Sequence, residues 1–145
     1  MVILRAFQSG DVNAVLELAN RYAAFDGSTS EADLAVTTGF PDGFWVAEDK
    51  GRIVGFAYGY FRDVPDQVLE KWGATKVGQV GLMAVEAGRR REGIGEALLQ
   101  GLLGAFEKAG ADLVLLDRPF EAVEAKWLYD KIGFEVRFYG MKKRF

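Results

Sequence analysis

The sequence predicts a single α/β domain built around one sheet. The chain has 145 residues, the usual size of one domain, and 50% of them are hydrophobic, which is enough for one substantial core. Strand-like runs of branched and aromatic residues alternate with segments of helical apolar spacing, in the order β-α-(α)-β-β-β-α-β-α-β. No linker rich in proline, glycine or serine divides the chain, so we expect residues 1–145 to form one domain.

The first half of the chain predicts a helix between strands. Residues 2–5 are strand-like, and the apolar spacing of residues 12–23 predicts a helix with Ser9 as its N-cap. Further elements follow by the same reasoning: a weaker helix over residues 30–38, strands over 43–49 and 52–61 joined by the tight turn "EDKG", and at least one helical turn within 64–73.

The second half predicts a strand–helix–strand unit. Residues 76–85 and 112–116 are strand-like, and a strong helix beginning near Gly93 and ending at about Lys108 separates them. Such a unit makes the two strands parallel neighbours with a right-handed crossover. Another helix is expected over residues 125–132. The final segment "FEVRFYGMKKRF" is expected to form one strand or a hairpin.

Composition excludes several classes of protein. The net charge of −3 argues against a dedicated nucleic-acid binder, and the absence of an 18-residue apolar run argues against a membrane span. The start of the chain lacks the apolar region of a signal peptide, so we expect a cytoplasmic protein with no nucleic-acid or membrane partner. Without cysteine or histidine, any acid–base chemistry must use carboxylates, tyrosine, lysine, a terminus or water, and we expect no metal.

The stretch "RRREGIGEALL", which begins at Arg89, combines positive charge, two glycines and a helix start. The first amides of a helix have no internal partner and favour an anion, which a glycine allows to approach closely. The loop therefore predicts a phosphate site, for which a pyrophosphate is the favoured ligand. Leu98 stands where a dinucleotide fingerprint needs a small residue, and a P-loop lysine motif is absent. A glycine-rich turn with solvated arginines is the alternative.

Two motifs resemble signatures of the GNAT superfamily of N-acetyltransferases. In "LMAVEAGRRREGIGEALL", Arg90, Gly93 and Gly95 match the first signature, Arg/Gln-x-x-Gly-x-Gly/Ala. In "AKWLYDKIGFE", the second signature is matched by Ala125, Leu128, Tyr129, Gly133 and Phe134. The resemblance covers nearly the whole chain. It implies an α/β fold with a mixed, mostly antiparallel central sheet, a splayed parallel strand pair, and helices on both faces.

The resemblance implies acetyl-CoA as co-substrate and direct transfer of its acetyl group to a primary amine. The loop amides would hold the pyrophosphate, and the preceding strand would pair with the pantetheine arm, with an amide near Leu82 or Met83 polarising the acetyl carbonyl. The implied cofactor-binding residues are Leu82, Met83, Ala84, Val85, Arg90, Arg91, Glu92, Gly93, Ile94, Gly95 and Glu96. Two positions depart from the family: Ala87 replaces a frequent proline, and Ala122 replaces an asparagine that contacts CoA.

The resemblance also assigns the proton transfers. Tyr129 matches the tyrosine that acts as acid toward the leaving thiolate, although its apolar helix face also fits a core tyrosine. Asp117, at the end of the strand over 112–116, is the first candidate for the base, and Glu86 is the second. A water relay is as good a candidate as Glu86, and the alternative role for Asp117 is a surface ion pair with Arg118.

The acceptor is expected to be a small amine, an amino acid or a peptide N-terminus. In the family, acceptor sites come from the first helices, the hairpin strands and the C-terminal strand, where this chain carries Tyr22, Phe25, Trp45, Tyr58, Tyr60, Trp72 and Tyr139, with Asp26, Asp63 and Asp66 nearby. Residues 62–73 are a candidate lid. The alternative functions are a non-catalytic acyl-CoA-binding or regulatory module and a plain interaction domain. A homodimer is one expectation for the oligomeric state, which the sequence does not fix.

Overall fold

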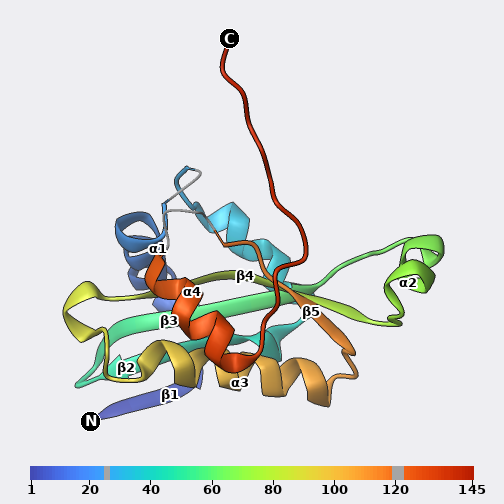
Figure 1. Ribbon diagram of the computed structural model, residues 1–145. Coiled ribbons are helices and arrows are strands. Elements are labelled where there is room, and N and C mark those ends of the chain that lie inside the picture. The colour runs from blue at the N-terminus through green and yellow to red at the C-terminus, as the bar shows by residue number, and fades with distance from the viewer. Residues whose placement is uncertain (25–26, 119–122) are drawn as a thin grey trace.

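The structure, a computed structural model, describes residues 1–24, 27–118 and 123–145, and over these residues it shows one five-stranded sheet (Figure 1). The strand order β1-β2-β3-β4-β5 follows the chain, with antiparallel pairing as far as β4 and a parallel β4–β5 pair at the edge. The strands are β1 (Val2–Ala6), β2 (Phe44–Asp49), β3 (Arg52–Phe61), β4 (Val77–Val85) and β5 (Leu113–Leu115). The predicted mixed sheet is confirmed.

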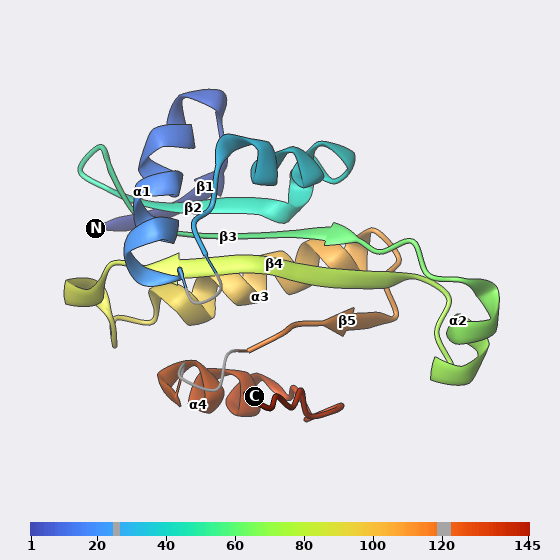
Figure 2. The ribbon, with the colours of Figure 1, turned by 90° about the horizontal axis from the view of Figure 1, so that it is seen from above.

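Helices cover both faces of this sheet, as expected. Helix α1 (Val12–Tyr22) lies on one face and α3 (Ile94–Lys108) on the other, while α4 (Val123–Ile132) lies beyond the β5 edge (Figure 2). The described chain also contains α2 (Asp66–Trp72) and the 3₁₀ helices η1 (Ser9–Asp11), η2 (Glu31–Gly39), η3 (Pro41–Gly43) and η4 (Ala87–Arg89). The weaker helix expected over residues 30–38 is thus the 3₁₀ helix η2.

Strand alternation divides the core into two layers. On β3, Phe56 and Tyr58 face α1, whereas Val54 and Ala57 face α3, so both faces of the central strand are buried. The α3 layer is built around the fully buried ring of Phe106, which lies over two glycines. A Cβ on Gly59 or Gly78 would come within 2.5 or 2.6 Å of that ring.

The start of α1 is held by Asp11 and not by Ser9, which is a correction to the predicted N-cap. Ser9 begins the short helix η1, and the cap is a capping box between Gln8 and Asp11, whose carboxylate accepts the Gln8 amide at 2.8 Å. The same carboxylate accepts two hydrogen bonds from the Arg5 guanidinium, at 2.8 and 2.9 Å. Asp11 suits this position because its carboxylate satisfies both a helix end and the half-buried guanidinium of Arg5.

The edge of the sheet opens near the middle of β4. Strands β4 and β5 are paired only over Val77–Gln79 and Leu113–Leu115. Just beyond, the register with β3 shifts between the pairs Gly59–Val80 and Tyr58–Leu82, which leaves Gly81 as the extra residue of a β-bulge. Figure 2 shows β4 continuing past the end of β5, with a gap on its β5 side.

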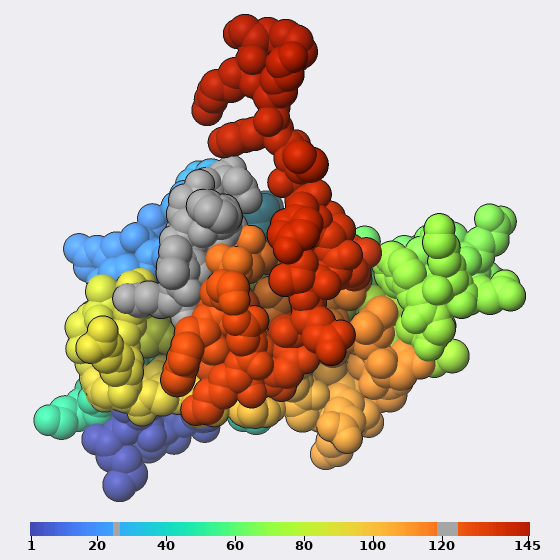
Figure 3. All heavy atoms as spheres, viewed as in Figure 1, coloured from blue at the N-terminus to red at the C-terminus, as the bar shows by residue number. Residues whose placement is uncertain are grey.

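The strand expected for the last twelve residues is wrong. After Phe134 the chain forms no strand and projects away from the body (Figure 3). Its large side chains are exposed, among them Phe138 at 59% and Met141 at 94%. Sequence alternation favours a strand, but a strand needs a partner edge, and the nearest edge strand, β5, has only three residues.

Within the described ranges, no helix has the length and apolar character needed to span a membrane.

Candidate active site

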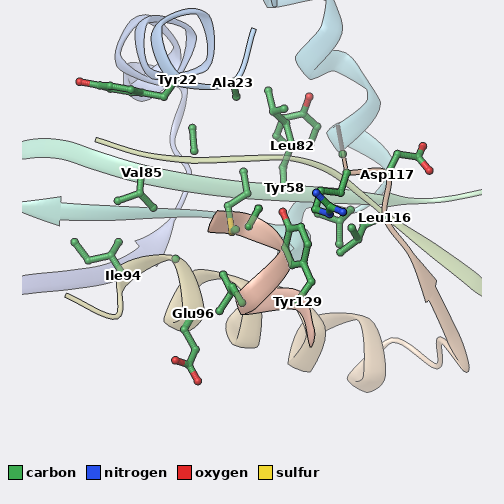
Figure 4. A pocket seen from close by; sticks show the side chains of 18 of the residues that line it. Tyr22, Ala23, Tyr58, Leu82, Val85, Ile94, Glu96, Leu116, Asp117 and Tyr129 are labelled. Atoms are coloured by element: carbon green, nitrogen blue, oxygen red, sulfur yellow. The ribbon is translucent and has the colours of Figure 1, made fainter. Parts of the chain in front are cut away.

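A large cleft lies where β4 and β5 diverge (Figure 4). Its floor is the second half of β4, and its walls come from the start of α3, the chain after β5, helix α4, and the α1–η2 region. Ligands of α/β proteins often bind at such a separation of parallel strands, beyond their carboxyl ends. Because segments far apart in the sequence converge here, the cleft exists only in the folded chain.

The free edge of β4 presents backbone groups to this cleft. The Glu86 amide donates to the Val54 carbonyl of β3 at 2.9 Å, and backbone groups alternate along an antiparallel strand. The N–H and C=O groups of Val85 and Met83 therefore face away from β3, toward the gap left by β5. Between the two expected candidates for the amide facing the acetyl group, the alternation favours Met83 over Leu82.

The loop after β4 ends in a row of free helix amides. The first hydrogen bond of α3 runs from the Ala97 amide to the Gly93 carbonyl at 3.0 Å, so the amides of residues 94–96 precede it. Gly93 has a left-handed backbone with φ of 80°, and Arg91 also has a positive φ, of 70°. A Cβ on Gly95 would lie 3.6 Å from Val85 and 3.7 Å from Leu128, and so would occupy the cleft itself.

The arginines of the loop differ in their contacts. Arg89 binds Asp49 at 2.8 Å and Glu92 at 2.8 Å, so it ties the loop to the end of β2. Arg90 is exposed, and its guanidinium lies 5.7 Å from the ring of Tyr22 at the mouth of the cleft. Arg90 and Arg91 both line the cleft, which gives its loop end positive charge.

Tyr129 lies in the cleft wall on α4. Its ring packs edge-on against Phe134 at 5.9 Å, and its hydroxyl points into the cleft toward β4 (Figure 4). Burial raises the pKa of the Tyr129 phenol, an effect that the positive charge of Arg118 only partly offsets. The phenol is therefore protonated at neutral pH and able to donate a hydrogen bond.

The two candidate bases lie in different places. Asp117 lines the cleft just after β5, is exposed, and turns its carboxylate away from Tyr129 (Figure 4). Glu86 lines a separate small hollow beside α1 and receives two hydrogen bonds from Arg52, at 2.6 and 3.0 Å. These bonds hold the pKa of the Glu86 carboxyl below its usual range, which weakens it as a base.

Comparison with protein families shows which family this chain belongs to. The sequence profile described as "Acetyltransferase (GNAT) domain" matches residues 41–136, which include the free edge of β4, the loop and α4. The chain belongs to the GNAT acetyltransferase family. The resemblance of the two motifs is thereby confirmed.

Individual relatives of this GNAT domain differ in their sequence identity to it and in how much of each chain is matched. L-2,4-diaminobutyric acid acetyltransferase of Nocardia farcinica is 39% identical over 102 residues, which cover 70% of this chain and 48% of the relative. An uncharacterised N-acetyltransferase of Methanocaldococcus jannaschii is 31% identical over 137 residues, covering 94% and 80%. The chain spans half or less of the length of several curated relatives. Among solved structures, Ard1 from Thermoplasma volcanium shares the fold, with a TM-score of 0.78, 24% identity, and coverage of 94% and 84%.

The cleft of this GNAT domain is lined by only part of the aromatic set that the sequence predicted for an acceptor site. Tyr22, Tyr58 and Tyr60 line the cleft. The other described members of that set do not line it: Trp45, Trp72 and Tyr139, together with Asp63 and Asp66. Phe25, Asp26 and Ala122 lie outside the described residues.

The candidate lid over residues 62–73 is wrong. Helix α2 stands at the end of β4 opposite the loop, far from the cleft (Figure 2). Trp72 packs there with Val77 and Leu115 around the start of β4 and β5. The length of this connection suggested a lid. In the structure, the small apolar face of α2 instead covers the end of the sheet.

Among the cleft residues that sequence reasoning missed are Asp33 and Trp127. Asp33 lies in η2 and accepts the Ser30 amide at 2.7 Å, a capping pattern visible in the sequence as Ser-x-x-Asp. Trp127 lies on α4 and is 69% exposed, with the Lys131 ammonium 5.3 Å from its ring. No local signal marks Trp127, since its position depends on how α4 packs beside β5.

In the described ranges, no group of three or more Asp, Glu, His or Cys side chains is arranged to hold a metal ion.

Proposed function

We propose that this domain transfers the acetyl group of acetyl-CoA directly to a primary amine. The observation that carries the proposal is the continuous path from the free edge of β4, at Met83 and Val85, to the unpaired amides of residues 94–96. An extended, amide-bearing arm suits the strand edge, and a diphosphate suits the helix start. Several relatives carry the name of an amine acetyltransferase, including the diaminobutyric acid enzyme of Nocardia.

The chain fits the co-substrate at its phosphate end. Gly93 and Gly95 keep the helix start accessible, and Arg90 and Arg91 bring positive charge to the same end of the cleft. We propose that Leu82, Met83, Ala84 and Val85 hold the pantetheine arm, and that residues 90–96 hold the pyrophosphate. Glu92 and Glu96 are the exceptions in charge, and each is paired with a cation, Glu92 with Arg89 and Glu96 with Lys131.

The reaction needs three contributions from the chain. An amide on the free edge, favoured to be that of Met83, stabilises the negative charge that develops on the acetyl oxygen. The acceptor ammonium must lose one proton before its nitrogen attacks, either to water or to the exposed carboxylate of Asp117. The carbon–sulfur bond then breaks, and the thiolate leaves toward the Tyr129 hydroxyl.

Tyr129 acts by donating a hydrogen bond to the leaving sulfur. A thiol has a pKa of about 8.5, whereas the pKa of the Tyr129 phenol lies above its usual value of about 10. Complete proton transfer to the thiolate is therefore uphill, and the bound phenol stabilises the sulfur while water supplies the final proton. The balance is one amide, one thiol and one released proton for each ammonium acetylated.

The test is thiol release from acetyl-CoA by the purified chain, with a panel of small amines, amino acids and peptides. The chain has no cysteine, so a thiol reagent reports only CoA. Turnover with at least one primary amine is the expected result. Tight CoA binding with no turnover on the whole panel would instead indicate the non-catalytic acyl-CoA module, and absence of CoA binding would contradict both functions.

A further inference from the structure

The wall of the cleft opposite α4 carries a charge of a different sign from the phosphate end. Within the described part of the chain, η2 and β3 contribute Asp33, Val36, Tyr58 and Tyr60 to the lining, and Asp33 is the charged side chain among them at neutral pH. The loop end instead carries Arg90 and Arg91. An incoming molecule therefore meets a negative, aromatic wall on the side formed by η2 and β3, whereas Asp117 and Arg118 line the side after β5.

This wall is close to the site of transfer. Tyr58 is paired in register with Leu82, one residue before Met83, and its ring lies against the bulge residue Gly81. In Figure 4 the Tyr58 hydroxyl points up from the sheet, on the side where η2 lies. Helix η2 contacts β3, and Leu34 of η2 is buried in the same core layer as Tyr58.

Asp33 is held in place by the chain rather than by a cation. One carboxylate oxygen accepts the Ser30 amide at 2.7 Å and the Ser30 hydroxyl at 3.2 Å, which fixes the side chain at the start of η2. Both donors are neutral, so the negative charge of Asp33 is retained. Its effect reaches the cleft, because burial first, and then the charges of Asp33 and Tyr60, raise the pKa of Tyr58 to about 12.

A carboxylate beside two tyrosine rings is a suitable site for a cation. The carboxylate offers a charge-assisted hydrogen bond, the hydroxyl oxygen of the nearly buried Tyr58 can accept another, and the partly exposed Tyr60 ring offers cation–π attraction. Resting on the acetyl transfer proposed above, we infer that Asp33, with Tyr58 and Tyr60, binds a second positive charge of the acceptor. The favoured acceptors are thus diamines or diamino compounds, acetylated at one amine and held by the other.

The experiment compares 1,3-diaminopropane with propylamine as acceptors. In the wild-type protein, the diamine is expected to have the higher kcat/KM. Asp33→Asn retains an acceptor for Ser30 but removes the charge, and it is expected to lower the diamine/propylamine ratio about tenfold while leaving propylamine nearly unchanged. The intrinsic reactivities of the two amines cancel when the ratios of variant and wild type are compared.

Two control variants separate charge from structure. Glu31→Gln removes an exposed charge from the same helix outside the cleft lining, and it is expected to leave the ratio unchanged. Ser30→Ala removes one donor to Asp33 but keeps its charge, and it is expected to keep the diamine preference. Equal losses for both amines in Asp33→Asn, or a lost preference in Ser30→Ala, would assign Asp33 a structural role and overturn the inference.

A binding measurement keeps this inference separate from the proposed function. If no amine is acetylated, the transfer proposal fails, and the Asp33 site is then judged by calorimetric titration of the CoA-loaded protein with 1,3-diaminopropane. Binding that weakens about tenfold in Asp33→Asn supports the cation site. Equal affinity in both proteins, or equal affinity for propylamine and the diamine in the wild type, refutes it.

Discussion

The ring of Tyr58 lies against the backbone of Gly81, so closely that a Cβ on Gly81 would come within 2.4 Å of the ring atom Cε1. Gly81 is the extra residue of the β4 bulge, and Tyr58 is 6% exposed between the rings of Phe44 and Phe56. The bulge that opens the cleft and the tyrosine in its wall therefore depend on each other.

Replacing Gly81 by alanine is expected to destabilise the fold by about 1–3 kcal/mol, because the buried Tyr58 ring has little room to move. Denaturant unfolding measures this change. In the double variant with Tyr58→Leu, the smaller side chain makes room, and the cost of the alanine is expected to fall below about 1 kcal/mol. Full additivity of the two changes would show that the contact is not the cause.

Gly95 allows the phosphate site to be tested without harm to the fold. A methyl group there meets only ordinary contacts, at 3.6 Å or more, and alanine favours helix, so Gly95→Ala is expected to leave thermal stability unchanged or slightly higher. Since the methyl would lie in the cleft, the affinity for CoA is expected to fall about tenfold or more, as measured by calorimetry.

Gly104→Ala is the matched control for Gly95→Ala. Gly104 lies in the same helix, exposed, with no atom within 4 Å of an added Cβ. It is expected to gain stability by about 0.5–1 kcal/mol with no change in CoA affinity. Equal CoA affinities for the two variants would place the phosphates away from the start of α3.

Tyr129→Phe separates catalysis from binding. The phenylalanine keeps the ring contact with Phe134 and removes the hydroxyl that points into the cleft. Turnover is expected to fall about 100-fold, with the CoA dissociation constant and melting temperature nearly unchanged. A variant that loses CoA binding and stability together would show that Tyr129 serves as a core residue.

The pH profile follows from the raised pKa of the Tyr129 phenol. The acceptor must be deprotonated and Tyr129 must be protonated, so kcat/KM is expected to rise with pH up to about 10 and to fall only above it. In Tyr129→Phe the rise remains. A decline of the wild-type rate between pH 8 and 9 would contradict this assignment, because the phenol is protonated throughout that range.

Asp11 is expected to be the most sensitive of the structural carboxylates. Its pKa is lowered by the Arg5 hydrogen bonds, so its contribution to stability is full above the unfolded pKa of about 3.9 and is lost as pH falls through the lower folded value. Asp11→Asn is expected to cost about 2 kcal/mol at pH 7, since both partners are partly buried, and thus to lower the melting temperature by several degrees.

The pH dependence and a control complete the Asp11 test. The difference between wild type and Asp11→Asn is expected to shrink below about pH 4, where Asp11 takes up its proton in the unfolded chain, and to be lost below the lower pKa of Asp11 in the folded protein. Asp130→Asn breaks the exposed pair with Lys126 on α4, and is expected to change stability by less than about 0.5 kcal/mol. Equal effects of the two variants would contradict the role of burial.

The order of strands and helices as far as α4, the family and the loop with its free amides could all be predicted from the sequence. Each depends on a short stretch of sequence. The period of apolar residues gives the strands and helices, the Gly-x-Gly after a strand gives the loop, and the spacing around Tyr129 supports the family. A helix that starts directly after a glycine loop presents free amides wherever it stands. For that reason, the proposed phosphate site could be predicted without knowing the rest of the fold.

Tertiary structure alone decided which residues form the cleft wall with Asp33, Tyr58 and Tyr60, and whether the end of the chain forms a strand. Which aromatics reach the cleft depends on which face of β3 they occupy and on where η2 packs, so Asp33 enters the wall while Asp63 and Asp66 stay with α2. The alternating C-terminal segment has strand character but no strand, because pairing requires a free edge of matching length, and β5 offers three residues. The local sequence pattern specifies which secondary structure a segment prefers, whereas contacts between distant segments decide what it pairs with.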